Sequence, residues 1–223
     1  LSIDNNKKLV IGNLNINAAN ISYKNDWYNN FINNICEIVF CDGKGIQLGA
    51  RLLGRPVPEH ITYHTWIWQL LEFCNYNKYS LFLLGSKPGV AELAFDKINI
   101  KYPNLKIGYS HGFFNKEGKE NIAIIDKINN YNTNILIVGF GMPLQEKWIV
   151  ANKDKINANI YLNGGAFLEW LSGTQRQAPK WVTKCYLEWF YRLIKDPIRL
   201  WKRYIVGNPL FIYRIMREKI DLL

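Results

Sequence analysis

The sequence lacks the features that mark membrane-spanning, secreted and metal-binding proteins. None of its 223 residues belongs to an apolar run of the roughly 20 residues that a membrane-spanning helix needs. The chain opens on LSIDNNKK rather than on a basic segment followed by an apolar stretch. Its four cysteines form no CxxC pair and only three histidines are present, so we expect neither a zinc site nor a disulfide framework. These absences predict a cytoplasmic protein with reduced, mostly buried thiols.

Negative charge is also scarce. The chain has 28 Lys and Arg against 18 Asp and Glu, which gives a formal net charge of +10. Most of the excess lies between Thr174 and Leu223. That segment has eleven basic and four acidic residues, which gives it a net charge of +7. Such a local field attracts phosphate, whether in nucleic acid, in anionic lipid headgroups or in a lipid diphosphate.

The alternation of apolar runs with helical patterns predicts an α/β fold. Six short apolar runs are typical of strands, at 8–12, 37–40, 80–84, 105–108, 134–138 and 158–162. Segments between them have helical periodicity, as where Trp27, Phe31 and Ile35 recur every four residues. This order predicts a Rossmann-like, mostly parallel sheet flanked by helices, within a core of residues 1–173. Residues 174–223 are basic and aromatic, with breaks at Pro197 and Pro209, and are predicted to form a helical appendage.

The ends of the predicted strands are the places to look for a site, because open α/β sheets bind ligands beyond the carboxyl ends of their strands. Asp42 follows the second strand and is a candidate general base for a hydroxyl group. The alternative is that Asp42 caps the next helix. Asn15 and Asn17 follow the first strand and are candidates to orient ligand hydroxyls.

Glycine-rich turns follow other strands and suit a phosphate ligand. Gly139-Phe140-Gly141-Met142-Pro143 comes after one strand, and the helix N-terminus behind it favours negative charge. This is not a dinucleotide fingerprint, because Leu144 stands at the third glycine position. Gln145, in the first helical turn, is placed to reach a ligand. The turn from Gly85 to Gly89 is equally consistent with a plain turn. The predicted nucleotide-binding residues are Asn17, Gly85, Gly112, Gly139, Gly141, Asn163 and Gly164.

The appendage interleaves cations with aromatic residues. Four basic residues, Arg192, Arg199, Lys202 and Arg203, alternate with Trp189, Tyr191, Trp201 and Tyr204. Trp and Tyr suit a membrane interface and Arg suits phosphate. We favour a surface for membrane or lipid phosphate over the alternatives, which are a solvated basic helix and a nucleic-acid patch.

Several segments resemble motifs of one family and occur in the order that the family has them. VGFGMPLQEKW (Val138–Trp148) resembles the GxGxPxQE signature of the WecG/TagA/CpsF glycosyltransferases. NGGAFLEWLSGTQRQAPKWV (Asn163–Val182) and LEWFYRLIKDPIRLWKRY (Leu187–Tyr204) are similar to later motifs of that family, and DGKGIQLGARLLGRPVP (Asp42–Pro58) fits as well. The resemblance spans nearly the whole chain.

This resemblance implies an inverting, metal-independent glycosyltransferase. It would move a hexose or N-acetylhexosamine-type sugar from a UDP-sugar to a polyprenyl-diphosphate-linked acceptor in bacterial cell-surface polysaccharide synthesis. The UDP-sugar is a co-substrate, so no cofactor is implied, and no nucleic-acid partner is expected. The appendage would hold the enzyme on the inner face of the cell membrane. Assembly into a homo-oligomer stays open.

The resemblance also assigns roles to residues. Asp42 matches the family's proposed catalytic Asp, and Gln145 matches its conserved Gln; with Asn15 they form the predicted catalytic set. The arginine trio that contacts the lipid diphosphate falls on Arg192, Arg199 and Lys202, with Arg203 as a possible substitute for the third.

Departures from the family pattern predict altered specificity. Asn15 stands where the family commonly has Thr, and Tyr63 and Thr65 replace a Gly and an Asp near the sugar. A bulkier, less acidic wall favours a different donor sugar or acceptor. Two other functions remain as alternatives: an accessory, non-catalytic subunit of a glycosyltransferase pair, or a basic nucleotide- or nucleic-acid-binding module.

Overall fold

The computed structural model describes residues 3, 7–57, 59, 61, 63–175, 178–179, 181–182 and 187–222, with only the backbone of residues 64 and 65. The chain forms two compact units. The first unit comprises Leu1–Gly12, Asn34–Ile38 and Tyr63–Arg176. The second comprises Asn13–Asn33, Val39–Thr62 and Gln177–Leu223, so it combines two early segments with the C-terminal one. The predicted core–appendage boundary at residue 174 stays a prediction.

The sheet has six strands in the order β2-β1-β6-β5-β3-β4. The strands are β1 (Leu9–Leu14), β2 (Ile38–Cys41), β3 (Leu81–Gly85), β4 (Ile107–Ser110), β5 (Ile135–Gly139) and β6 (Ile160–Asn163). Parallel pairing joins β1 to β6, β6 to β5, β5 to β3 and β3 to β4. The predicted Rossmann-like α/β fold is confirmed, and each strand begins one or two residues after its predicted start.

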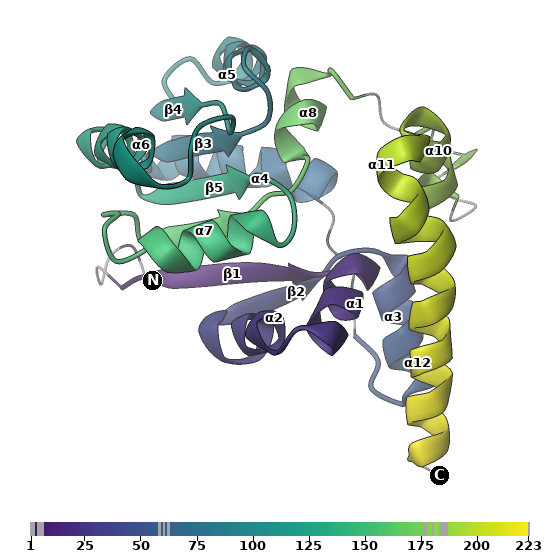
Figure 1. Ribbon diagram of the computed structural model, residues 1–223. Coiled ribbons are helices and arrows are strands. Elements are labelled where there is room, and N and C mark those ends of the chain that lie inside the picture. Colours follow the sequence, from purple (N-terminus) through teal and green to yellow (C-terminus); the bar gives the residue numbers. More distant parts are fainter. Residues whose placement is uncertain are drawn as a thin grey trace. The chain divides into compact units, whose positions relative to one another are not determined.

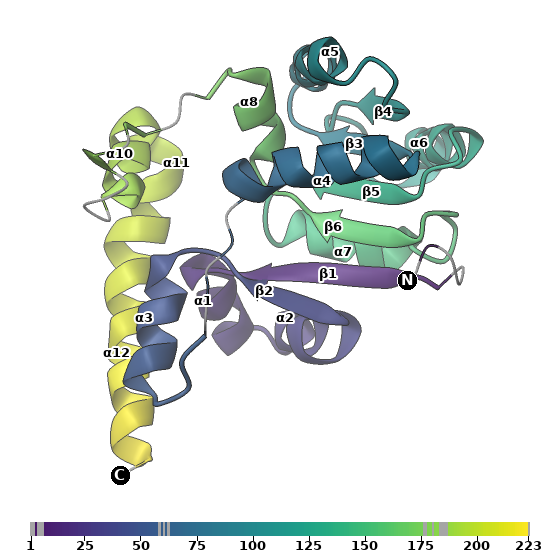
Figure 2. The ribbon, with the colours of Figure 1, turned by 180° about the vertical axis from the view of Figure 1, so that it is seen from behind.

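The first unit carries the centre of the sheet. Every residue of β3 and β5 is buried, as expected for parallel strands that helices cover on both faces. Its helices are α4 (Tyr63–Asn77), α5 (Val90–Lys101), α6 (Gly118–Asn130), α7 (Leu144–Asn152) and α8 (Phe167–Ser172). Figures 1 and 2 show α4 and α7 on opposite faces of the strands.

The second unit is mainly helical. It contains α1 (Ile16–Lys24), α2 (Asp26–Asn30), α3 (Lys44–Leu52), α10 (Glu188–Lys195), α11 (Pro197–Trp201), the π-helical turn η2 (Lys202–Val206) and α12 (Gly207–Asp221). A second π-helical turn, η1 (Phe31–Ile35), continues α2 at the boundary with the first unit. In both views α12 runs alongside α3 and α1 (Figures 1 and 2).

The two prolines of the appendage behave differently. Pro197 opens α11 and Asp196 caps it, so the predicted break is confirmed there. Pro209 lies in the first turn of α12 and does not interrupt the helix, so that predicted break is wrong. The π-helical turn just before it explains the difference, because such a turn already departs from the hydrogen-bond ladder that a proline disrupts.

None of the helices in the described ranges is both long and apolar enough to cross a bilayer. Three cysteines are described, and all three are free thiols. Only Cys74 is buried, whereas Cys36 and Cys41 are half-buried; Cys185 lies outside the described residues. Removal from water raises the pKa of the Cys36 and Cys74 thiols to about 12, so neither is a ready nucleophile.

Gly85 tests how tightly the turns of the first unit pack. A Cβ atom at residue 85 would lie 2.5 Å from the carbonyl oxygen of Gly139, and backbone cannot move aside easily. We therefore expect Gly85→Ala to lower the free energy of unfolding by about 1–3 kcal/mol. Urea denaturation measures this. Lys87→Ala, at an exposed site two residues away, is the control and should change stability by less than about 0.5 kcal/mol.

Candidate active site

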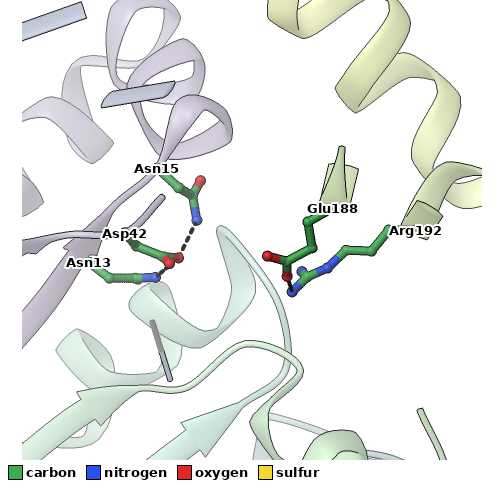
Figure 3. Close-up of polar contacts among 5 residues, drawn as sticks. All are labelled: Asn13, Asn15, Asp42, Glu188 and Arg192. Carbon is green, nitrogen blue, oxygen red and sulfur yellow. Dashed lines mark hydrogen bonds and ion pairs between the residues drawn. The ribbon is translucent and has the colours of Figure 1, made fainter. Parts of the chain in front are cut away.

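A carboxylate held by two amides stands at the ends of β1 and β2. Asp42 directly follows β2, and its backbone N–H donates to the carbonyl of Leu14 at 2.9 Å. The side-chain amides of Asn13 and Asn15 donate to Asp42 Oδ2 at 3.0 and 3.2 Å (Figure 3). Gly43, not Asp42, occupies the cap position of α3, so the alternative role of Asp42 as a helix cap is wrong.

Asn15 has a second contact that fixes its orientation. Its Oδ1 accepts from the backbone N–H of Ala18 at 3.0 Å, which makes it the cap of α1. Asn17 is the second residue of α1 and is half-buried. Asn13 was missed at the sequence level. Its signal was a buried polar residue near the end of the otherwise apolar strand LVIGNL.

The surroundings of Asp42 favour its protonated form more than water does. Removal from water raises its pKa above the usual range for aspartic acid. Hydrogen bonds from Asn15 and Asn13 oppose that rise, as do the positive charges of Arg192 and Arg203. The result is a carboxylate with more proton affinity than a solvated one, which is what a general base requires.

The cations of the appendage differ in exposure: Arg192 and Arg203 are half-buried, whereas Arg199 and Lys202 are exposed. Arg192 pairs with Glu188 at 2.7 Å, and Figure 3 shows this pair across from the Asp42 cluster. Arg199 is exposed and pairs with Asp196. Arg203 is half-buried, and removal from water lowers its pKa while the charge of Asp42 partly restores it. Lys202 is exposed, with Nζ 5.5 Å from the centre of the Trp201 ring.

The glycines of the first unit serve two different purposes. A Cβ at Gly85, Gly112, Gly139 or Gly164 would come within 2.9 Å of a neighbouring backbone or side-chain atom, so these four are needed for packing. Gly141 and Gly165 have φ of +83° and +58°, and nothing lies within 4 Å of their Cβ positions. No protein atom fills the Cβ direction of either glycine, and the same is true of Gly89 and Gly118 in this unit. Gly165 was not among the residues predicted from sequence.

Gln145 connects the turns at Gly141 and Gly165. Its Oε1 accepts from the backbone N–H groups of Gly141 and Gly165, at 3.2 and 3.0 Å. Its Nε2 donates to Glu146 Oε1 at 2.8 Å, and the amide of Asn163 donates to the same oxygen at 3.0 Å. Gln145, Glu146 and Asn163 are all fully buried. The geometry therefore gives Gln145 a positioning task, whereas direct contact with a ligand stays a prediction.

Two further residues at the strand ends have defined partners. Tyr63 is buried against Phe167 and Trp66, and its hydroxyl donates to the Asn163 carbonyl at 2.8 Å. Its ring is therefore part of the support beneath β6; the side chain of Thr65 lies outside the described residues. Ser86, with φ of +59°, donates to Glu169 Oε1 at 2.9 Å. Non-glycine residues seldom adopt this conformation, and Lys78 and Asn132 adopt it as well.

These residues belong to a chain that matches a known family over nearly its whole length. The model of the family described as "Glycosyl transferase WecG/TagA/CpsF family" matches residues 2–223. The chain belongs to this family. It is a glycosyltransferase.

The curated relatives include proteins from three Staphylococcus aureus strains, MW2, NCTC 8325 / PS 47 and COL. Each is named N-acetylglucosaminyldiphosphoundecaprenol N-acetyl-beta-D-mannosaminyltransferase and is 28% identical over 213 residues. The match covers 95% of this glycosyltransferase and 81% of each relative. In the described part of the glycosyltransferase, no group of three or more His, Cys, Asp or Glu side chains is placed to hold a metal ion.

Replacing Gln145 tests the link between the glycine turns. Gln145→Met fills a similar volume but leaves two backbone N–H groups without their acceptor, which costs about 1–3 kcal/mol for each buried group. We expect a lower melting temperature and weaker UDP binding by calorimetry. Lys147→Met, at an exposed position of the same helix, is the control. Wild-type UDP affinity in Gln145→Met would contradict a role for this residue in shaping the turns.

Proposed function

We propose that this glycosyltransferase moves a hexose or N-acetylhexosamine-type sugar from a UDP-sugar to a polyprenyl-diphosphate-linked sugar acceptor. The reaction inverts the anomeric centre, needs no metal and serves bacterial cell-surface polysaccharide synthesis. The observation that carries the proposal is the placement of Asp42 and the appendage arginines within one compact unit. The names of the relatives support it, since they specify a sugar acceptor on a diphosphate lipid.

The base in this mechanism is Asp42. Its carboxylate takes the proton from the acceptor hydroxyl, and the hydroxyl oxygen attacks the anomeric carbon of the donor. The bond between that carbon and the UDP oxygen breaks, and UDP leaves with the electron pair. Asn13 and Asn15 hold the carboxylate in one orientation through Oδ2. General-base catalysis of this kind contributes about 10²–10⁴-fold.

The donor diphosphate belongs to the first unit in this proposal. Gly141 and Gly165 allow its close approach, and the N-terminus of α7 favours the charge that develops on the leaving group. Gln145 holds the two turns in place for this purpose.

The acceptor diphosphate belongs to the second unit. Arg192 and Arg199 already hold acidic partners, Glu188 and Asp196, which keep their guanidinium groups ordered until a diphosphate shares them. Arg203 takes the third place of the family trio, because it is half-buried and its charge, like that of Arg192, favours the Asp42 carboxylate. Lys202, being exposed, is better placed to meet lipid headgroups.

The appendage also offers a surface for peripheral binding to the inner face of the cell membrane. Exposed apolar side chains run along α10, α11 and η2, and Ile198 is 90% exposed. The others there are Trp189, Phe190, Ile194, Trp201, Ile205 and Val206. Basic residues such as Lys195 and Lys202 accompany them, which suits an anionic bilayer.

Asp42→Asn tests the base. Turnover should fall by about 10²–10⁴-fold while UDP binding stays intact. Because the folded protein raises the pKa of Asp42, its charged form is destabilising above that pKa, and the penalty disappears as the pH falls through it. The variant should therefore be at least as stable as the wild type at neutral pH. Product mass and thermal unfolding measure both effects. Asp126→Asn, on the exposed face of α6, is the control, and near-normal turnover in Asp42→Asn would rule out the role.

The pH dependence of the reaction can distinguish the roles of Arg203 and Lys202, which are neighbours in η2. Arg203→Met removes a positive charge that favours the Asp42 carboxylate, so the acidic limb of the kcat/KM profile should move to higher pH. Lys202→Met should leave that limb in place and weaken binding to anionic vesicles by about 1 kcal/mol. If the acidic limb lies at the same pH in both variants, Arg203 has no special effect on Asp42, and its assignment to the third place of the trio fails.

The wider experiment is a screen of UDP-sugars against a synthetic lipid-diphosphate-sugar acceptor. Transfer by the isolated protein supports an enzyme, and transfer only with a second chain supports the accessory-subunit alternative. A gel shift with generic DNA, compared with UDP calorimetry, tests the nucleic-acid alternative.

A further inference from the structure

Asn20 joins the beginning of the chain to its end within the second unit. It lies on α1, and its Nδ2 donates to the carbonyl of Gly207 at 2.7 Å. Its Oδ1 accepts from Arg214 NH1 at 2.7 Å, across 194 residues of sequence. Both ends of one side-chain amide are thus used to hold the C-terminal helix α12 on α1.

Arg214 has further contacts with α1. Its guanidinium carbon lies 3.9 Å from the centre of the Tyr23 ring, a stacked arrangement that favours a planar cation. It is half-buried, unlike most cations of the appendage. We call Asn20, Tyr23 and Arg214 the α1–α12 clamp.

The other side of α12 packs against α3. A Cβ at Gly49 would come within 2.9 Å of the Phe211 ring, so the two helices approach at a residue without a side chain. Lys219 donates to the carbonyl of Leu52 at 2.7 Å, at the end of α3. Since α3 begins two residues after Asp42, α12 is attached to both helices that adjoin the Asp42 cluster.

The clamp therefore links Asp42 to the arginines by a short route. Asn15 both donates to Asp42 and caps α1, and Asn20 lies five residues further along that helix. Gly207, which receives the Asn20 bond, directly follows the turn η2 that contains Arg203. One nine-residue helix and one amide thus connect the Asp42 cluster to the turn that contains Arg203.

We propose that the α1–α12 clamp positions the appendage arginines against Asp42. This inference rests on the proposed function and deepens it. The clamp residues are positioning residues, since they act through Arg203 and Asp42 rather than on reacting atoms. The clamp would thereby hold the arginines that bind the acceptor diphosphate in register with the base. Misplacement by about 1 Å can cost on the order of 10²-fold in rate.

Arg214→Met and Arg217→Met make a matched pair. Both remove one positive charge from α12, but Arg217 is exposed and lies 4.0 Å from Asp221 on its own helix. We expect Arg214→Met to lower kcat on the lipid-linked acceptor by about 10–100-fold relative to Arg217→Met. The Kd for UDP and the affinity for vesicles of anionic phospholipid should be the same in both. Equal kcat values would overturn the proposal, as would a parallel loss of UDP binding.

A second variant covers the case in which Arg214→Met does not fold. Asn20→Asp keeps an acceptor for Arg214 but removes the donor to Gly207, so it should show a similar loss of kcat with normal UDP binding. Arg214→Lys should recover part of the rate, because an ammonium still donates to Asn20. Wild-type kcat in Asn20→Asp would count against the clamp.

Hydrogen exchange separates failure of the clamp from failure of the proposed function. Amides of residues 197–207 should exchange faster in Arg214→Met than in Arg217→Met, whatever the reaction is. Faster exchange together with an inactive wild type would retain the clamp and reject the transferase mechanism. Unchanged exchange would reject the clamp even if transfer is observed.

Discussion

The structure depends on the two hydrogen bonds that bring Asn13 and Asn15 to Asp42. They join the end of β1 to the residue that follows β2. Asn15 also caps α1, so the same side chain fixes the start of that helix relative to Asp42. A carboxylate withdrawn from water is costly unless polar groups surround it. Here the amide hydrogen bonds oppose the rise in pKa that burial causes, and the pKa of Asp42 still lies above its usual range. The two helices that α12 packs against, α1 and α3, both begin beside this cluster.

Under the proposed function, the two units would bind phosphate in different ways. The first unit relies on backbone, since Gly141 and Gly165 leave their Cβ directions open and Gln145 fixes the turns. The second unit relies on side-chain charge, with Arg192 and Arg199 ordered by acidic partners and Arg203 held away from water. Backbone dipoles suit a leaving group that must be released, whereas guanidinium forks suit an acceptor diphosphate that must be recognised.

The sequence was most informative where structure is local. Apolar runs mark the strands, whose residues are buried in β3 and β5 and more exposed in β2, so all six could be predicted. Asp42 was identified because it follows β2. The roles of the glycines could not be separated, because Gly85 and Gly139 pack against backbone while Gly141 stays open, and both kinds look alike in sequence. Asn13, Gly165 and the Asn20–Arg214 contact were missed, since each depends on partners that only the fold brings together.

The discontinuity of the second unit has a consequence for synthesis of the protein. Its first segments, Asn13–Asn33 and Val39–Thr62, have to wait for Gln177–Leu223 before the unit is complete. The partner of Asn20 emerges from the ribosome 194 residues later, whereas most of the first unit is continuous from Tyr63 to Arg176 and can fold beforehand. The nascent chain therefore contains the complete turns at Gly141 and Gly165 before the unit that holds Asp42 is complete.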